Sequence, residues 1–314
     1  MISQTTYDAA DRSTGTSQVM VDAANPDGRT LWSTTTHYDL TGQVDWTLDR
    51  FGNRSETVYD QRGLVIQSRR RATDENGNTQ WLVTRTVYDD KGQAIYTTDE
   101  YVDPGDGTSP PVWGTHTVYD AAGRVTKTER IKDMVVEIID TATGQVVGDP
   151  SGSGLSTLAS QLSGAGTVVS STQTFFDSAG RVDYTVDQYG TETRYTYDAA
   201  GRQIETRTQA KDQNGQLQWL VTRTVYDAAG RTVVTTDQYV EGSADPVTGT
   251  RSVYDDAGRV VRTEKLEGVV VDIDATGPHP KSVLTDPGTV VWLTETLYDI
   301  AGRVVKSTGQ HAPG

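Results

Sequence analysis

Cysteine is absent from the 314 residues, so neither disulfide bonds nor thiolate metal sites support the fold. Phenylalanine and methionine occur three times each, and no apolar run is long enough to cross a membrane as a helix. Positive charge is scarce, because 28 Lys and Arg face 43 Asp and Glu for a formal net charge of −15. Phosphate binding needs a basic face, so this charge argues against a nucleic-acid partner and is compatible with solubility, a basic partner or cations. The opening Met1-Ile-Ser-Gln does not predict a signal peptide.

Glycine, by contrast, occurs 31 times, and the segments between glycines are crowded with Thr, Val and Tyr, which suit strands with one wet face. One phrase, YDAAGRV at 119–125, recurs along the chain. Asp120 can accept hydrogen bonds from the backbone amides ahead of it, and Gly123 supplies a left-handed residue without Cβ strain. This pattern predicts a type I turn followed by a G1 bulge, so each copy is interpreted as the tip of a β-hairpin.

The flanking residues predict how each tip is closed. Asp120 should pair with Arg124, and Tyr119 should lie opposite Val125, at roughly 0.2–1 kcal/mol for each pair. If such hairpins stack side by side, their tyrosines fall at one level and form an aromatic ladder. We expect the ladder to give more of the stability and the exposed charged pair to give more of the register.

The phrase occurs ten times, in a damaged form at Tyr7 and then at nine further tips. The tip residues are Tyr38, Asp39 and Gly42; Tyr59, Asp60 and Gly63; Tyr88, Asp89 and Gly92; Tyr119, Asp120, Gly123 and Arg124; Phe176, Asp177, Gly180 and Arg181; Tyr197, Asp198, Gly201 and Arg202; Tyr226, Asp227, Gly230 and Arg231; Tyr254, Asp255, Gly258 and Arg259; and Tyr298, Asp299, Gly302 and Arg303.

Five tips depart from the pattern. Gln43, Leu64 and Gln93 stand where Arg is expected, so the closing ion pair should be missing there while the turn survives. Phe176 keeps the ring without the hydroxyl, which indicates that packing matters more than a hydrogen bond at that tip. In the first copy Asp11 replaces Gly; Asp tolerates the left-handed region better than most residues, and we expect this copy to be frayed.

The tips are unevenly spaced. Starting at Tyr38, successive tips are 21, 29, 31 and 57 residues apart, and starting at Phe176 they are 21, 29, 28 and 44 residues apart. WLVTRTVYD at 81–89 recurs letter for letter at 219–227, 138 residues later. We therefore expect a single array over 1–314, with a remnant of an earlier unit at 1–37, one super-repeat at 38–175 with an insert at 141–170, and a second at 176–313.

Between the tips the chain must return. DRFGN at 49–53 and DQYGT at 187–191 predict return turns, and Asn-Gly in DENGN at 74–78 and DQNGQ at 212–216 predicts two-residue type I′ turns. The stretches 101–114 and 239–249 hold Pro and Gly and are expected to be loops at a common edge. The runs at 134–140 and 269–274 are strongly β-prone. The low-complexity segment 151–166 predicts a flexible excursion or one short helix.

These phrases resemble the YD repeats of rearrangement-hotspot (RHS) proteins, which also occur in the C component of insecticidal toxin complexes and in teneurins. The match extends over nearly the whole chain and includes RYTYDAAGR at 194–202. The resemblance implies an all-β array of antiparallel hairpins, joined edge to edge into a curved or spiral open sheet that forms part of a hollow shell. It also implies a secreted or cell-surface parent protein whose shell encloses a toxin or other protein cargo, and partners that are neighbouring repeats or further copies joined through open edges. No segment at the C-terminus resembles the self-cleaving protease block or the toxin of such members.

The sequence holds no motif that predicts a catalytic site, and we expect no enzyme activity, cofactor or metal. The four histidines lack metal-ligand spacing, and most Asp residues are already assigned to turns. Several tryptophans, with Trp113 and Trp292 as the candidate binding residues, could form a strip for sugars, although packing within the wall is the plainer interpretation. An adhesion or carbohydrate-binding module is therefore the alternative function. A β-propeller enzyme acting on polysaccharides is a remote one, because the spacings do not fit equal blades.

Overall fold

The computed structural model describes residues 1–22, 25–151 and 157–311. These residues form strands and turns and no helix, and the chain divides into two units, Met1–Ser171 and Thr172–Gly314. The all-β fold of antiparallel hairpins is confirmed. The division falls near the expected boundary between the two super-repeats, whose duplication remains a prediction.

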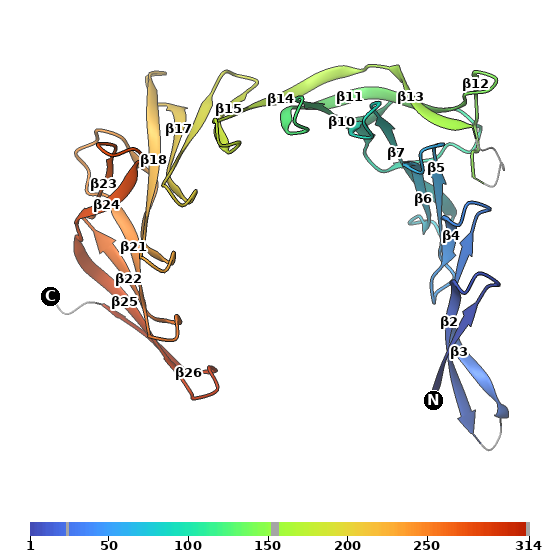
Figure 1. The fold of residues 1–314 in the computed structure, drawn as a ribbon, viewed down its shortest axis with the longest axis horizontal. Coiled ribbons are helices and arrows are strands. Elements are labelled where there is room, and N and C mark those ends of the chain that lie inside the picture. The colour runs from blue at the N-terminus through green and yellow to red at the C-terminus, as the bar shows by residue number, and fades with distance from the viewer. Residues whose placement is uncertain (23–24, 152–156, 312–314) are drawn as a thin grey trace. The chain divides into compact units, whose positions relative to one another are not determined.

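In the first unit each strand pairs antiparallel with the next along most of the chain (Figure 1). Its strands are β1 (Ile2–Tyr7), β2 (Ser13–Asp22), β3 (Asn25–Tyr38), β4 (Val44–Leu48), β5 (Arg54–Tyr59), β6 (Val65–Thr73), β7 (Thr79–Tyr88), β8 (Ala94–Thr98), β9 (Tyr101–Val102), β10 (Val112–Tyr119), β11 (Val125–Asp140), β12 (Gln145–Val146) and β13 (Leu158–Gly164). The strand β14 (Thr167–Phe176) runs from this unit into the second.

The second unit repeats the arrangement. Its strands after β14 are β15 (Val182–Asp187), β16 (Glu192–Tyr197), β17 (Gln203–Lys211), β18 (Leu217–Tyr226), β19 (Thr232–Thr236), β20 (Tyr239–Val240), β21 (Thr248–Tyr254), β22 (Val260–Glu267), β23 (Val270–Asp274), β24 (Lys281–Asp286), β25 (Thr289–Tyr298) and β26 (Val304–His311). β23 and β24 pair only with each other and form a separate two-stranded sheet among the described residues.

The core of each unit lies where a second layer of strands covers the main sheet. The second layer consists of the end of β11 with β13 in the first unit, and of β23 with β24 in the second. In the first unit the end of β11 carries Ile138 and β13 carries Leu158, and these side chains pack with Val58 and Ile66 of β5 and β6. In the second unit Val271 of β23 is buried in a cluster with the sheet residue Val234. The apolar faces of the sheet are therefore removed from water by the segments that separate distant tips.

The segment 151–166 was expected to be flexible or helical, and this expectation is wrong for its described part. Residues 158–164 form the strand β13, which pairs antiparallel with β11 and buries Leu158 at 3% exposure. Residues 152–156 lie outside the described part of the chain. The strand forms because the free edge of β11 offers backbone partners to a segment that has few preferences of its own.

The Pro- and Gly-containing stretches are only partly loops. Tyr101 and Val102 pair as β9 with β7, and Tyr239 and Val240 pair as β20 with β18. Strand β10 starts at Val112, so the irregular part of the first stretch is limited to 103–111. The β-prone run at 134–140 lies in β11, and residues 270–274 of the second run form β23.

Candidate functional site: the ladder of hairpin tips

One turn geometry recurs at all ten tips. At YDAAGRV the amide of Asp120 donates to the carbonyl of Arg124, and the amide of Gly123 donates to the carbonyl of Asp120. Gly123 has φ 80°, and Tyr119 lies opposite Val125 with a register shift beside it. These features define the expected type I turn with a G1 bulge.

The same pair of backbone bonds closes the four return turns, including both Asn-Gly turns. At DENGN the amide of Asp74 donates to Asn78, and Gly77 alone has a left-handed φ of 83°. A type I′ turn needs positive φ at both central residues, so the prediction of type I′ turns is wrong. The Asp74 carboxylate accepts bonds from the amides of Asn76 and Asn78, and these bonds stabilise the longer loop.

The aspartate carboxylate of each tip accepts hydrogen bonds from backbone amides of its own loop. Asp120 accepts from the amides of Ala122 and Arg124 at 2.9 Å each, while the Arg124 guanidinium lies 2.7 Å from the second oxygen. The backbone bond from Arg124 is the largest cause that lowers the pKa of Asp120. The carboxylate therefore stays charged at neutral pH, and its role is to order five residues of backbone.

The first tip forms the same turn although it lacks glycine. Asp11 adopts the left-handed conformation with φ 61°, and the Asp8 and Arg12 backbone groups bond as at other tips. Arg12 also pairs with Asp8 at 2.7 Å. The expectation that this copy is frayed is therefore wrong for its turn.

Eight of the ten tips are tied to the tip before them by the tyrosine hydroxyl. The hydroxyl donates to the carbonyl of the seventh residue of the preceding phrase, at 2.7–3.0 Å. The donor and acceptor pairs are Tyr38 and Ser13, Tyr59 and Val44, Tyr88 and Val65, Tyr119 and Ala94, Tyr197 and Val182, Tyr226 and Gln203, Tyr254 and Thr232, and Tyr298 and Val260. Burial raises the pKa of Tyr59, Tyr88 and Tyr197, which keeps these hydroxyls protonated as donors. Phe176 has no hydroxyl and cannot donate such a bond.

Beside the tyrosine bond, a contact between an arginine and a tyrosine ring connects neighbouring tips. At five junctions the arginine of one tip lies over the tyrosine ring of the next, with 4.4–4.7 Å between guanidinium carbon and ring centroid. These pairs are Arg12 with Tyr38, Arg181 with Tyr197, Arg202 with Tyr226, Arg231 with Tyr254, and Arg259 with Tyr298. The arginine thus closes its own turn and covers the next ring, so one side chain serves both the turn and the lateral contact.

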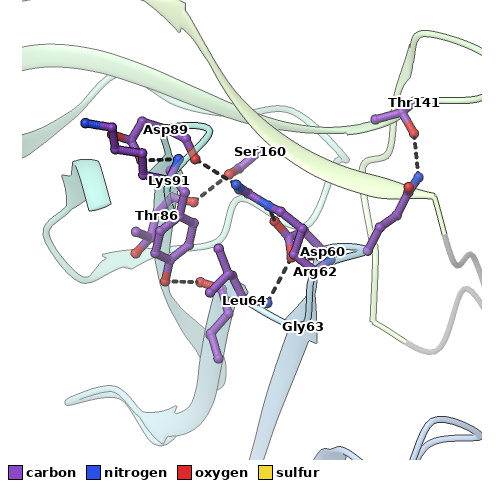
Figure 2. A network of polar contacts seen from close by, with 12 residues as sticks. Asp60, Arg62, Gly63, Leu64, Thr86, Asp89, Lys91, Thr141 and Ser160 are labelled. Carbon is purple, nitrogen blue, oxygen red and sulfur yellow. Dashed lines mark hydrogen bonds and ion pairs between the residues drawn. The ribbon is translucent and has the colours of Figure 1, made fainter. Parts of the chain in front are cut away.

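The tip at Asp60 keeps an ion pair although Leu64 replaces the arginine. Arg62, inside the loop, donates to the Asp60 carboxylate at 3.0 Å and to the carbonyl of Asp89 in the next tip at 2.7 Å (Figure 2). Leu64 cannot form the closing pair, and Arg62 gives Asp60 a different ion pair inside the loop. The sequence signal was present, since Arg62 lies two residues after the aspartate it serves.

At the tips with Gln43 and Gln93 the turns survive as expected. The Gln43 amide donates across to the carbonyl of Gly63 in the next tip at 3.3 Å, so a neutral side chain takes over the lateral contact. At this tip the sixth position of the phrase therefore bridges to the next tip without a charge.

Two arginines that the sequence did not single out, the buried Arg85 and the half-buried Arg223, fix the second layer to the main sheet. Arg85 in β7 donates to the carbonyl of Val136 in β11 at 2.7 Å and to Gln67 at 2.8 Å. The equivalent Arg223 in β18 donates to the carbonyl of Val271 at 2.6 Å and to the Glu205 carboxylate at 2.8 Å. Both arginines lie in the stretch that recurs letter for letter, which was the available signal.

The tryptophans proposed as binding residues are about half exposed and lie against other side chains. Trp113, 42% exposed, has the Arg130 guanidinium over its ring at 5.2 Å. Trp292, 40% exposed, contacts His311 edge to face at 4.8 Å. They lie in different units, in β10 and β25.

Two of the four histidines pair with carboxylates of neighbouring strands. His37 bonds Asp45 at 2.6 Å, and His116 bonds Glu129 at 2.7 Å. The described residues hold no group of three or more His, Asp or Glu side chains placed to bind a metal ion. Among the same residues no helix is long and apolar enough to cross a membrane.

No family model and no curated protein matches this chain. Among solved structures it is similar to TcdB2-TccC3 crystallised without the hypervariable C-terminal region, at 14% identity and TM-score 0.40, over 98% of this chain and 17% of that one. A second crystal structure of TcdB2-TccC3 gives 13% identity and the same TM-score, over 98% and 18% of the two chains. The Photorhabdus luminescens Tc holotoxin pore gives 10% identity and TM-score 0.19, over 95% and 18%. The chain thus spans under a fifth of these structures' length, and scores this low carry no argument about its function.

Proposed function

We propose that this chain is a non-catalytic structural segment of the YD-repeat (RHS) type, a stretch of β-wall that encloses a protein cargo or scaffolds a secreted or cell-surface protein. The observation that carries this proposal is the tip ladder. Each junction joins neighbouring hairpins by main-chain pairing, and eight tips add a tyrosine bond to the tip before. A wall needs such lateral closure, because a hairpin that opens leaves a gap.

The residue chemistry supports the same proposal. The tip carboxylates order backbone, and the arginines close turns and cover tyrosine rings, so the recurring polar groups serve the array itself. At about 0.5–1.5 kcal/mol for a hydroxyl bond and about 0.5–1 kcal/mol for an exposed cation–π contact, each lateral link is modest. Repetition along the array makes the wall resistant to local opening.

The test is made on the longest natural protein that contains this chain. A low-resolution envelope by electron microscopy should show a hollow body, and a solid particle would overturn the proposal. Changing Tyr197, Tyr226 and Tyr254 together to Ala should then make the enclosed segment sensitive to protease. The matched control is Tyr189→Ala, since Tyr189 lies in a return turn and is 83% exposed.

The carbohydrate-binding alternative depends on Trp113 and Trp292. A glycan array provides its test with the chain as it stands. Binding that disappears in Trp113→Ala while the thermal melt is unchanged would favour the adhesion module over the wall.

A further inference from the structure

Strands β1 and β26 each have one edge that pairs with no other described strand. All six residues of β1 are exposed and pair only with β2, and all eight residues of β26 are exposed and pair only with β25, among the described residues. Such edges present unpaired backbone donors and acceptors to any strand of the right register. The register that these edges prefer is set by the junctions inside the chain.

Internal junctions share one register although their connections differ in length. Val234 lies opposite Arg251, which places Tyr254 opposite Arg231. Arg262 lies opposite Glu295, which places Tyr298 opposite Arg259 in the same way. In both cases the tyrosine of one tip faces the sixth residue of the preceding phrase.

In the first tip Asp11 stands at the glycine position of the phrase. In this register that position lies beside the arginine of the preceding tip. A Cβ added to Gly230, Gly258 or Gly302 would lie 3.6–3.7 Å from Nη1 of the preceding tip's arginine. Asp11 occupies the equivalent position in the first tip, in the same left-handed conformation, and it has that Cβ with a carboxylate attached. Asp11 therefore directs negative charge toward the place of a preceding tip's guanidinium.

We propose that β1 of one copy of this chain docks on β26 of a second copy in the ladder register. Tyr7 then lies opposite Arg303, its hydroxyl donates to the carbonyl of Val304, and Asp11 pairs with the Arg303 guanidinium. The Arg303 side chain is 80% exposed and Tyr7 is 59% exposed, so both are accessible. The contact covers the exposed Val304 and uses opposite charges on the two edges.

This contact is heterologous, so copies join head to tail. The docking depends on the ladder register and not on a hollow shell, so its failure would leave the proposed wall function standing. High salt should weaken it, because the ion pair is exposed.

The test is sedimentation velocity of the full chain over a wide dilution series. The wild type should associate as its concentration rises. Asp11→Gly restores the residue of every other tip, so it should fold normally and associate about two- to fivefold more weakly. Arg303→Asp adds repulsion to the lost attraction and should weaken association about tenfold or more.

Asp256→Lys is the control, because Asp256 is an exposed residue of an internal tip, and it should leave association unchanged. The decisive arm mixes two charge-reversed proteins, Asp11→Lys and Arg303→Asp. Each alone should associate weakly, and the equimolar mixture should recover association, since opposite charges again face each other. A wild type that stays monomeric at every concentration, or variants that associate as strongly as the wild type, would overturn the proposal.

Discussion

Replacing Arg223 by methionine tests how the second layer is held on the sheet. Methionine fills a similar volume but removes the donors to the Val271 carbonyl and the Glu205 carboxylate. The chain supplies its own matched control, because Arg85 makes the equivalent contact to Val136 but bonds the neutral Gln67 in place of a carboxylate.

The two substitutions should differ in magnitude. Arg223 and Glu205 have side chains that are 17% and 7% exposed, so Arg223→Met leaves a nearly buried carboxylate without its cation. Breaking a buried pair in this way costs about 3–5 kcal/mol, and the partial exposure places the value near the lower end. Arg85→Met leaves neutral acceptors unsatisfied and should cost about 1–3 kcal/mol.

Native-state hydrogen exchange of each unit is the appropriate assay, because an array need not unfold as one cooperative block. Glu205→Gln copies the first unit and should change the opening free energy of β17 and β18 by less than about 1 kcal/mol. The double variant Glu205→Gln with Arg223→Met should recover part of the loss of Arg223→Met. The reasoning is refuted if the double variant is as unstable as Arg223→Met, or if Arg85→Met costs as much.

Three further outcomes follow from the tips. Tyr226→Phe should lower local stability by about 0.5–1.5 kcal/mol in exchange measurements, while Tyr189→Phe in a return turn should have no effect; equal effects would remove the ladder bond from the account. Gly230→Ala forces a Cβ into a φ of 83° and should cost about 1–2 kcal/mol by urea unfolding, and a neutral result would contradict the turn. The backbone bond from Arg231 lowers the folded-state pKa of Asp227. The ionised carboxylate therefore contributes to the folding stability above about pH 4, and this stability is lost as the pH falls through the lowered folded-state pKa. Asp227→Asn should show a flatter acid dependence of the urea midpoint.

Sequence reasoning succeeded where the physics is local. Asp120 and Gly123 determine their turn within five residues, so the tip and the pairing of Tyr119 with Val125 could be predicted. It failed at DENGN because the general preference of Asn-Gly for type I′ turns was weighed above the local bonds of Asp74. It missed the ion pair of Asp60, because an arginine was expected only at the sixth position of the phrase and Arg62 is the fourth residue.

The amino-acid sequence by itself determined the all-β class and the places where the chain turns, because an aspartate that binds its own amides and a glycine with positive φ act without distant partners. Only the tertiary structure decided what joins one tip to the next and what covers the sheet. The Tyr226 hydroxyl reaches a carbonyl 23 residues away, and Arg223 reaches one 48 residues away. Such contacts exist only after the strands have paired, so no local pattern specifies them.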